Sequence, residues 1–146
     1  MRIKLHIRLR ASSSYVFSLL HDYSLRAGWD TFVPDAVLLN AKQAGRGVVV
    51  RCTDRFGLVM ETVYVGFRPP HLATIRMTRG PGVFEQLAGS WRLADSGECE
   101  CVLHVTYNLK TRPRWARPVL EPIVAGLFWL QTRRRLRALA LYVHRR

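Results

Sequence analysis

Acidic residues are scarce in this sequence. The chain has 10 aspartate and glutamate residues against 23 lysine and arginine residues, which gives a formal net charge of +13 over 146 residues. An excess of this size predicts attraction to anionic partners such as nucleic acid, acidic lipid headgroups or an acidic protein. Two simpler explanations stay open: a basic surface that serves only solubility, and a coding bias toward arginine.

Cysteine is equally rare, with Cys52, Cys99 and Cys101 alone. An odd count is a poor basis for a disulfide framework and favours a reducing cytosol over secretion. Cys99 and Cys101 are expected on one face of a strand, where buried, inert thiols are the usual finding. A zinc site would need a fourth ligand and a closer grouping, so we expect neither a metal nor a cofactor.

Long apolar runs are also absent. The longest, residues 119–130, is too short to span a bilayer and contains Glu121 and Pro122. The first ten residues alternate in polarity, so we do not expect them to form a signal peptide. With 49% apolar residues, the chain is expected to form one globular domain over residues 1–146. We expect a cytoplasmic protein that contacts membranes peripherally or not at all.

Alternating polarity predicts that most of the chain is β-structure. Residues 2–10 show a clean period of two, and a serine-capped helical stripe from Val16 to Tyr23 follows, then a second short helix or turn over residues 23–27. Glycine- and proline-rich turns separate the remaining strands. These strands are expected at residues 37–41, 48–53, 58–67, 72–79, 83–93 and 99–109.

The C-terminal segment, residues 115–146, is the one stretch long enough for a long helix. Leu136, Leu139, Ala140 and Val143 keep the spacing of a buried helical stripe. The turns before it are too short for parallel crossovers, so the sheet is predicted to be antiparallel, and a sheet of this size must curl. We therefore predict an α+β fold in which a curved sheet wraps around the C-terminal helix.

Four motifs, in this order, resemble the START-like helix-grip superfamily, and within it the polyketide cyclase/dehydrase and lipid-transport branch. The resemblance covers essentially the whole chain. The motifs are the first strand with its capped helix; Asp22-Tyr23 with Trp29-Asp30 and Val33-Pro34; Phe67-Arg68-Pro69-Pro70; and Gly89-Ser90-Trp91-Arg92-Leu93 with the strand 101–109 and a Leu- and Arg-rich helix.

This resemblance implies a seven-stranded antiparallel sheet, a hydrophobic cavity under the long helix, and small hydrophobic ligands such as lipids, isoprenoids or polyketides. It does not imply one activity, because members include cyclases, carriers and regulatory modules. The chain departs from the family pattern in the first helical turn, where it has serines instead of an acidic residue or proline, and in its larger basic excess.

The cavity wall is predicted from large apolar side chains, because aromatic residues dominate apolar pockets. Simple core filling is the alternative for each of them. The predicted wall residues are Trp29, Phe32, Met77, Trp91, Tyr107, Leu127 and Phe128.

Catalysis, if present, has to use polar groups in the cavity, because the sequence has no nucleophile motif and its five histidines are scattered. The strand phase of Val63, Val65 and Phe67 places Glu61 on the same face, and the phase of Trp91 places Glu85 inward. Burial would raise the pKa of both carboxyls, as a general acid or base requires. A β-bulge, or solvent access at a strand end, would remove this role.

The arginines near the C-terminus form the other candidate site. Arg133, Arg134, Arg135 and Arg137 are predicted to make an exposed basic surface. Such a surface suits an anionic membrane, with RNA or a ribosome as the rival partner and a merely solvated helix face as the third interpretation.

Three functions therefore remain. The first is a carrier or binding protein for a hydrophobic small molecule. The second is an enzyme of the cyclase, aromatase or dehydrase type. The third is an interaction protein whose basic face binds RNA.

Overall fold

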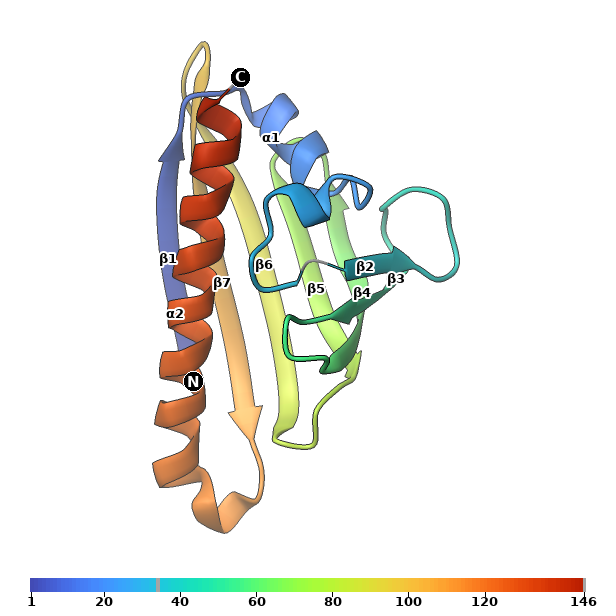
Figure 1. Ribbon diagram of the computed structural model, residues 1–146, viewed down its shortest axis with the longest axis vertical. Coiled ribbons are helices and arrows are strands. Elements are labelled where there is room, and N and C mark those ends of the chain that lie inside the picture. Colours follow the sequence, from blue (N-terminus) through green and yellow to red (C-terminus); the bar gives the residue numbers. More distant parts are fainter. Residues whose placement is uncertain (34, 146) are drawn as a thin grey trace.

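A seven-stranded antiparallel sheet curves around one long helix (Figure 1). The computed structural model describes residues 1–33 and 35–145, so Pro34 of the predicted Val33-Pro34 motif and Arg146 lie outside the described residues. The strand order in the sheet is β1-β7-β6-β5-β4-β3-β2, as the helix-grip prediction requires. The elements are β1 Arg2–Leu9, α1 Ser13–Leu20, η1 Arg26–Gly28, β2 Asp35–Leu38, β3 Val49–Thr53, β4 Val59–Arg68, β5 Leu72–Arg79, β6 Phe84–Gly97, β7 Glu100–Thr111, η2 Arg114–Ala116 and α2 Arg117–His144.

The helical segments after β1 are shorter than predicted. Ser12 caps α1 by accepting a hydrogen bond from the backbone N–H of Tyr15 at 3.2 Å, and α1 ends at Leu20. Ser13 anchors the same turn, because its hydroxyl donates to the carboxylate of Asp95 on β6. The second helix is a single 3-10 turn, η1, and it carries the buried side chain of Arg26.

Strand β6 extends beyond its predicted end. Asp95 pairs with Cys101, and Gly97 with Glu100, so residues 95–97 belong to the strand and the turn to β7 lies at residues 98–99. Cys99 lies in the turn and is exposed, whereas Cys101 on β7 is buried. The expectation that both thiols share a buried strand face is therefore wrong.

The inward phase of β4 also differs from the prediction. Register shifts occur between Glu61 and Thr62 and again between Tyr64 and Gly66. An irregularity of this kind changes which side chains face inward. Thr62 and Tyr64 are consequently buried, while Val65, which was predicted on the core face, is exposed.

Helix α2 presents one buried stripe to the sheet. Its buried residues are Ala125, Phe128, Thr132, Arg135, Leu136, Leu139 and Val143. Figure 1 shows α2 running alongside β1 and β7. Within residues 1–33 and 35–145, no helix is both long and apolar enough to cross a membrane.

Candidate functional site

A cavity of about 460 Å³ lies between α2 and the inner face of the sheet. Its wall comes from strands β3 to β7, from α2, from the segment between α1 and β2, and from the turn between β3 and β4. The lining is mostly apolar, with polar groups from Arg26, His21 and Gln131. A volume in this range and a wall of this kind are typical of sites for small hydrophobic ligands.

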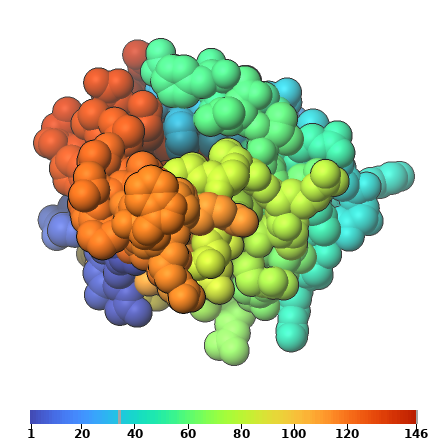
Figure 2. All heavy atoms as spheres, turned by 90° about the horizontal axis from the view of Figure 1, so that it is seen from below, coloured from blue at the N-terminus to red at the C-terminus, as the bar shows by residue number. Residues whose placement is uncertain are grey.

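The cavity opens at one end of the molecule. Figure 2 looks at this end and shows a hollow framed by the start of α2 in orange, the β3–β4 turn in green and the β5–β6 turn in yellow-green. Three residues line the cavity and are also largely exposed: Phe56 and Leu58 of the β3–β4 turn and Leu127 of α2. They therefore form part of its mouth.

Six of the seven predicted wall residues line this cavity, and they are Trp29, Phe32, Trp91, Tyr107, Leu127 and Phe128. The ring of Phe128 contacts Tyr107 and Phe32 edge to face, at centroid distances of 4.8 and 5.9 Å. Met77 is different, because it packs against the core without lining the cavity.

The prediction that Glu61 and Glu85 point into the cavity is wrong. Glu61 lies beside Arg51 on the neighbouring strand, with 3.7 Å between carboxylate and guanidinium, and Glu85 accepts a hydrogen bond from Arg117 of 3.0 Å. Neither residue lines the cavity. In β4 the extra residue is Val65, between Tyr64 and Gly66, so Glu61 faces away from the side on which Phe67 packs. In β6 the extra residue is Glu85 itself, between Phe84 and Gln86.

The polar end of the cavity is built on Asp30, which is 2% exposed. Its carboxylate accepts hydrogen bonds from Nε and NH2 of Arg135 at 3.1 and 3.0 Å, and from NH1 of Arg26 at 3.0 Å. The backbone N–H groups of Phe32 and Val33 donate to the same carboxylate. Burial acts to raise the pKa of Asp30, but the two guanidinium groups outweigh it and hold this pKa below the usual value.

Arg135 was predicted on the basic surface and is instead buried, with 5% exposure. It lies seven residues after Phe128 and four before Leu139, so helical geometry places it on the inward stripe. Arg133, Arg134 and Arg137 are exposed, and the guanidinium of Arg133 stacks 5.4 Å from the Trp129 ring. The basic surface therefore consists of three arginines, not four.

Both buried guanidinium groups lie against aromatic rings. Arg135 is 5.2 Å from the ring of Trp91 and 5.8 Å from that of Phe32, while Arg26 is 4.7 Å from Tyr23 and 5.3 Å from Trp29. Such cation–π contacts stabilise a desolvated cation.

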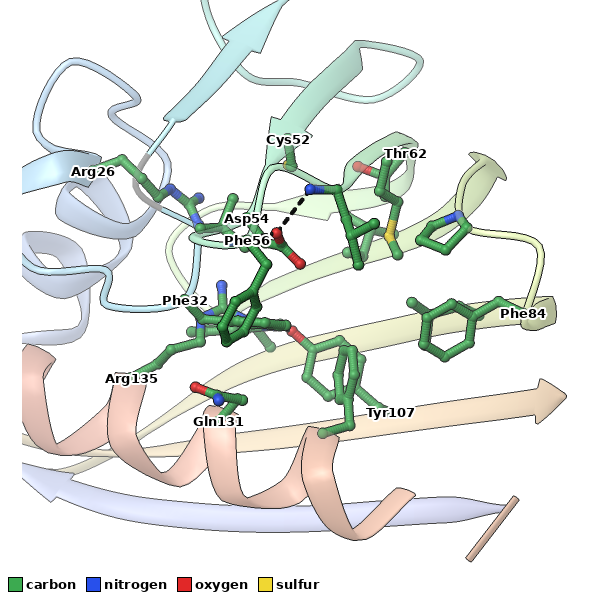
Figure 3. Close-up of a pocket in the computed structure, with 18 of the residues that line it drawn as sticks. Arg26, Phe32, Cys52, Asp54, Phe56, Thr62, Phe84, Tyr107, Gln131 and Arg135 are labelled. Carbon is green, nitrogen blue, oxygen red and sulfur yellow. Dashed lines mark hydrogen bonds between the residues drawn. The ribbon is translucent and has the colours of Figure 1, made fainter. Parts of the chain in front are cut away.

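The Tyr107 hydroxyl links this end of the cavity to the sheet. It accepts from Trp91 Nε1 at 3.1 Å and from Arg135 NH1 at 3.3 Å. Figure 3 shows Arg135 and Gln131 rising from α2, and Tyr107 from β7, into the space between helix and sheet.

A second polar group, formed by His21, Tyr64 and Tyr23, lies in the same wall. His21 Nδ1 is 2.8 Å from the Tyr64 hydroxyl, which also contacts the Tyr23 hydroxyl. Burial, helped by the charge of Arg26, lowers the pKa of His21 to about 3. The imidazole is therefore neutral at neutral pH, and burial also raises the pKa of Tyr64, so both groups are uncharged.

Several buried polar atoms of the described residues have no hydrogen-bond partner within the protein. They are His21 Nε2, Arg26 Nε, Trp29 Nε1 and Gln131 Oε1. Buried polar atoms without partners are costly in a folded protein, and all four belong to residues that line the cavity, on α2 and on the segment between α1 and β2. In residues 1–33 and 35–145, no group of three His, Cys, Asp or Glu side chains is arranged to hold a metal ion.

Solved structures share this architecture. A START superfamily protein from Mycobacterium smegmatis aligns with a TM-score of 0.84 and 16% identity, covering 99% of this chain and 97% of its own. The Zhui aromatase/cyclase from Streptomyces sp. R1128 aligns at 0.80 and 18% identity, covering 100% of this chain and 94% of its own. Norcoclaurine synthase from Thalictrum flavum, in complex with a transition-state analogue, aligns at 0.71 and 13% identity, covering 99% and 94%.

The fold is thus the helix-grip fold of START-like proteins. At the level of sequence, the family described as polyketide cyclase/dehydrase and lipid transport matches residues 1–144, and the chain belongs to this family. No curated protein sequence matches the chain.

Proposed function

We propose that this protein binds a hydrophobic small molecule, such as a lipid, an isoprenoid or a polyketide-like compound, as a carrier or binding protein. The observation that carries this proposal is the cavity of about 460 Å³, which opens at one end and has a largely apolar wall. Binding of an apolar molecule there would remove water from side chains such as Phe32, Ile75 and Leu87, which gives the main driving force.

A pair of bulky substitutions tests this proposal. Ile75 on β5 lines the cavity and pairs with Tyr64 on β4, whereas the next residue of β4, Val65, is exposed and does not line the cavity. Ile75→Trp fills the cavity, whereas Val65→Trp adds the same ring outside it. The measurements are native mass spectrometry of freshly purified protein and titration with the uncharged dye Nile red, with circular dichroism to check folding.

We expect a co-purified small molecule or saturable Nile red binding in the wild type. Ile75→Trp should weaken dye binding by about tenfold or more, because the indole ring occupies space that the dye would fill and so reduces the contact area between dye and cavity wall. Val65→Trp should leave dye binding unchanged. Equal dye binding by both folded variants, together with a wild-type mass free of any ligand, would overturn the proposal.

A further inference from the structure

The polar end of the cavity carries an uncompensated positive charge. Arg26 and Arg135 contribute two guanidinium groups, and both are paired with the single carboxylate of Asp30. His21 is neutral, because burial and Arg26 lower its pKa to about 3. Burial acts to lower the pKa of Arg135 as well, but Asp30 and Tyr107 outweigh it, so the guanidinium stays charged. The cluster therefore has one positive charge in excess.

The excess positive charge of the cluster lies on the side that faces the cavity. Arg26 and Arg135 both line the cavity, whereas Asp30 does not, so the carboxylate holds the guanidinium groups from the far side. NH1 of Arg26 donates to Asp30 and NH2 donates to the carbonyl of Leu20, while Nε is buried without a hydrogen-bond partner.

Neighbouring atoms add further unused hydrogen-bonding capacity. Trp29 Nε1 is a second buried donor without a partner in the same wall. Asp54 is the one carboxylate among the described residues of the lining, and its Oδ1 accepts hydrogen bonds from the backbone N–H groups of Phe56 and Leu58 in its own turn. Figure 3 draws one of these two bonds.

We propose that this end of the cavity binds an anionic oxygen group of the ligand, so that the ligand is an amphiphile with an apolar body and a carboxylate or similarly acidic head. This inference rests on the proposed function and specifies its ligand class. A buried cation of this kind is stabilised by an opposite charge, and charge-assisted hydrogen bonds are the strongest that a small head group forms. The apolar body then lies in the cavity against the wall that includes Phe84 and Phe128.

The test compares two probes that differ only at the head, dodecanoate and 1-dodecanol, by isothermal titration calorimetry. The decisive variant is Arg26→Gln, because it removes the excess charge and leaves Asp30 paired with both nitrogens of Arg135. Arg26→Lys, which keeps the charge, is the matched control. Wild-type protein should bind dodecanoate roughly 10- to 100-fold more tightly than 1-dodecanol.

Arg26→Gln should lose that preference with little change toward 1-dodecanol, and Arg26→Lys should keep most of it. If the wild type binds both probes equally, the head-group site is wrong and the hydrophobic cavity stands. If it binds neither, the head-group proposal falls, and the Nile red titration and native mass spectrum decide the hydrophobic cavity separately. Because the wild-type comparison is informative alone, a variant that does not fold leaves the proposal testable.

A separate observation concerns the elements that frame the cavity mouth, the start of α2 and the β3–β4 turn, which carry large exposed apolar side chains. On the α2 side, Val119 and Ile123 are 71% and 57% exposed, and Trp115 of η2 is 85% exposed. On the facing β3–β4 turn, Phe56 is 69% exposed and Leu58 53%. We call these five residues and Leu127 the apolar rim. Exposed apolar patches of this kind mark interaction sites.

The charges beside the apolar rim are mostly basic, although Asp54 lies in the β3–β4 turn and Glu121, paired with the N-terminal amino group, lies between Val119 and Ile123. Arg55, Arg112 and Arg114 are exposed in the same turns, and Arg55 lies 5.5 Å from the Phe56 ring. The nearby acidic Glu85 is paired with Arg117. Aromatic and aliphatic side chains flanked by arginine match the interface of an anionic bilayer, where rings insert at headgroup depth and guanidinium groups contact phosphates.

We propose that the apolar rim docks on an anionic membrane surface, with the cavity mouth facing the bilayer. Docking in this orientation lets a hydrophobic molecule pass between bilayer and cavity without crossing water. The docking surface itself does not depend on which ligand the cavity holds.

Vesicle flotation tests this surface, using phosphatidylcholine with and without phosphatidylglycerol. The rim variant is Val119→Asp/Ile123→Asp, and the control is Leu141→Asp, which alters an exposed leucine, 61% accessible, far along the same helix. Wild type and Leu141→Asp should float with the anionic vesicles and much less with the neutral ones. The rim variant should lose roughly tenfold or more in partitioning.

Absence of wild-type flotation, or equal flotation of the rim variant and the control, would overturn membrane docking. Sedimentation velocity separates the main rival. A dimer that forms in wild type and disappears in Val119→Asp/Ile123→Asp would assign the apolar rim to self-association instead.

Discussion

Asp30 and Arg135 form a two-point ion pair across 105 positions of sequence, with Nε and NH2 of the guanidinium donating to the two carboxylate oxygens at 3.1 and 3.0 Å. The pair connects the segment after η1 to the middle of α2. It therefore fixes the helix against the part of the chain that closes the cavity, and both side chains are nearly fully buried.

Replacement of this carboxylate should be strongly destabilising. Asp30→Asn leaves two buried guanidinium groups without a counter-charge, so we expect the free energy of unfolding to fall by about 3–5 kcal/mol. Urea denaturation measures the change. Asp35→Asn, on an exposed aspartate of β2, is the matched control and should change stability by less than about 0.5 kcal/mol. Similar losses in the two variants would contradict a structural role for the Asp30 cluster.

Stability should depend on pH through His21. Its pKa is about 3 in the folded protein, because of burial and Arg26, against 6.5 when unperturbed. Between these values only the unfolded chain binds the proton, so stability is full above about pH 6.5 and falls as the pH decreases, by up to about 1.4 kcal/mol per unit. The pKa of Asp30 is also lowered, from an ordinary value of 3.8, so its contribution is lost only at the acid end of this window.

A His21→Asn variant isolates this contribution. From about pH 6.5 to pH 5, wild type should lose roughly 2 kcal/mol more than the variant, as measured by denaturation at each pH. The other histidines are present in both proteins and cancel. Parallel pH profiles would show that His21 is protonated as easily in the folded state as in the unfolded one.

Gly89 on β6 should tolerate no side chain. A methyl group there would lie 2.6 Å from Cε1 of Tyr107, its cross-strand neighbour, and would push the ring away from Trp91 and Arg135. We expect Gly89→Ala to cost about 1–3 kcal/mol and to weaken Nile red binding. Gly66→Ala meets Thr74 only at an ordinary 3.5 Å and is the comparison variant. Equal behaviour of the two would mean that the Tyr107 ring moves freely.

Glu61→Gln and Glu85→Gln should each change stability by less than about 1 kcal/mol, because both carboxylates form ion pairs with arginines outside the cavity. Nile red and dodecanoate binding should also be unchanged. If either variant stays folded but loses binding, the replaced carboxylate takes part in ligand binding and this prediction is wrong.

Much of the fold was predictable, because alternation and turn residues define strands locally. The period of two in residues 2–10 matches β1 and its pairing with β7, in which Ile3 faces Tyr107 and Leu9 faces Cys101. The covering role of α2 followed from its length and its apolar stripe. Bulges were not predictable, since a single extra residue in β4 or β6 reverses the facing of Glu61 or Glu85 without any change in composition.

The polar half of the site was missed for a related reason. Arginine near the end of a basic helix normally faces water, which predicts an exposed Arg135, but its spacing from Phe128 and Leu139 places it on the buried stripe. Asp30 belongs to the Trp29-Asp30 motif, but nothing in the sequence indicates that it pairs with Arg135, 105 residues away. His21 is four residues after Phe17, and helical spacing alone would have put its ring beside that side chain, where it lies at 4.5 Å.

The four tryptophans form one buried and one exposed pair of fluorescent side chains. Trp29 and Trp91 line the cavity beside the buried guanidinium groups, whereas Trp115 and Trp129 are exposed on η2 and α2. Ligand entry should therefore change emission from the first pair, and quenchers in water or in lipid should act on the second. The native chain thus reports filling of the cavity and contact at its surface separately, without any added label.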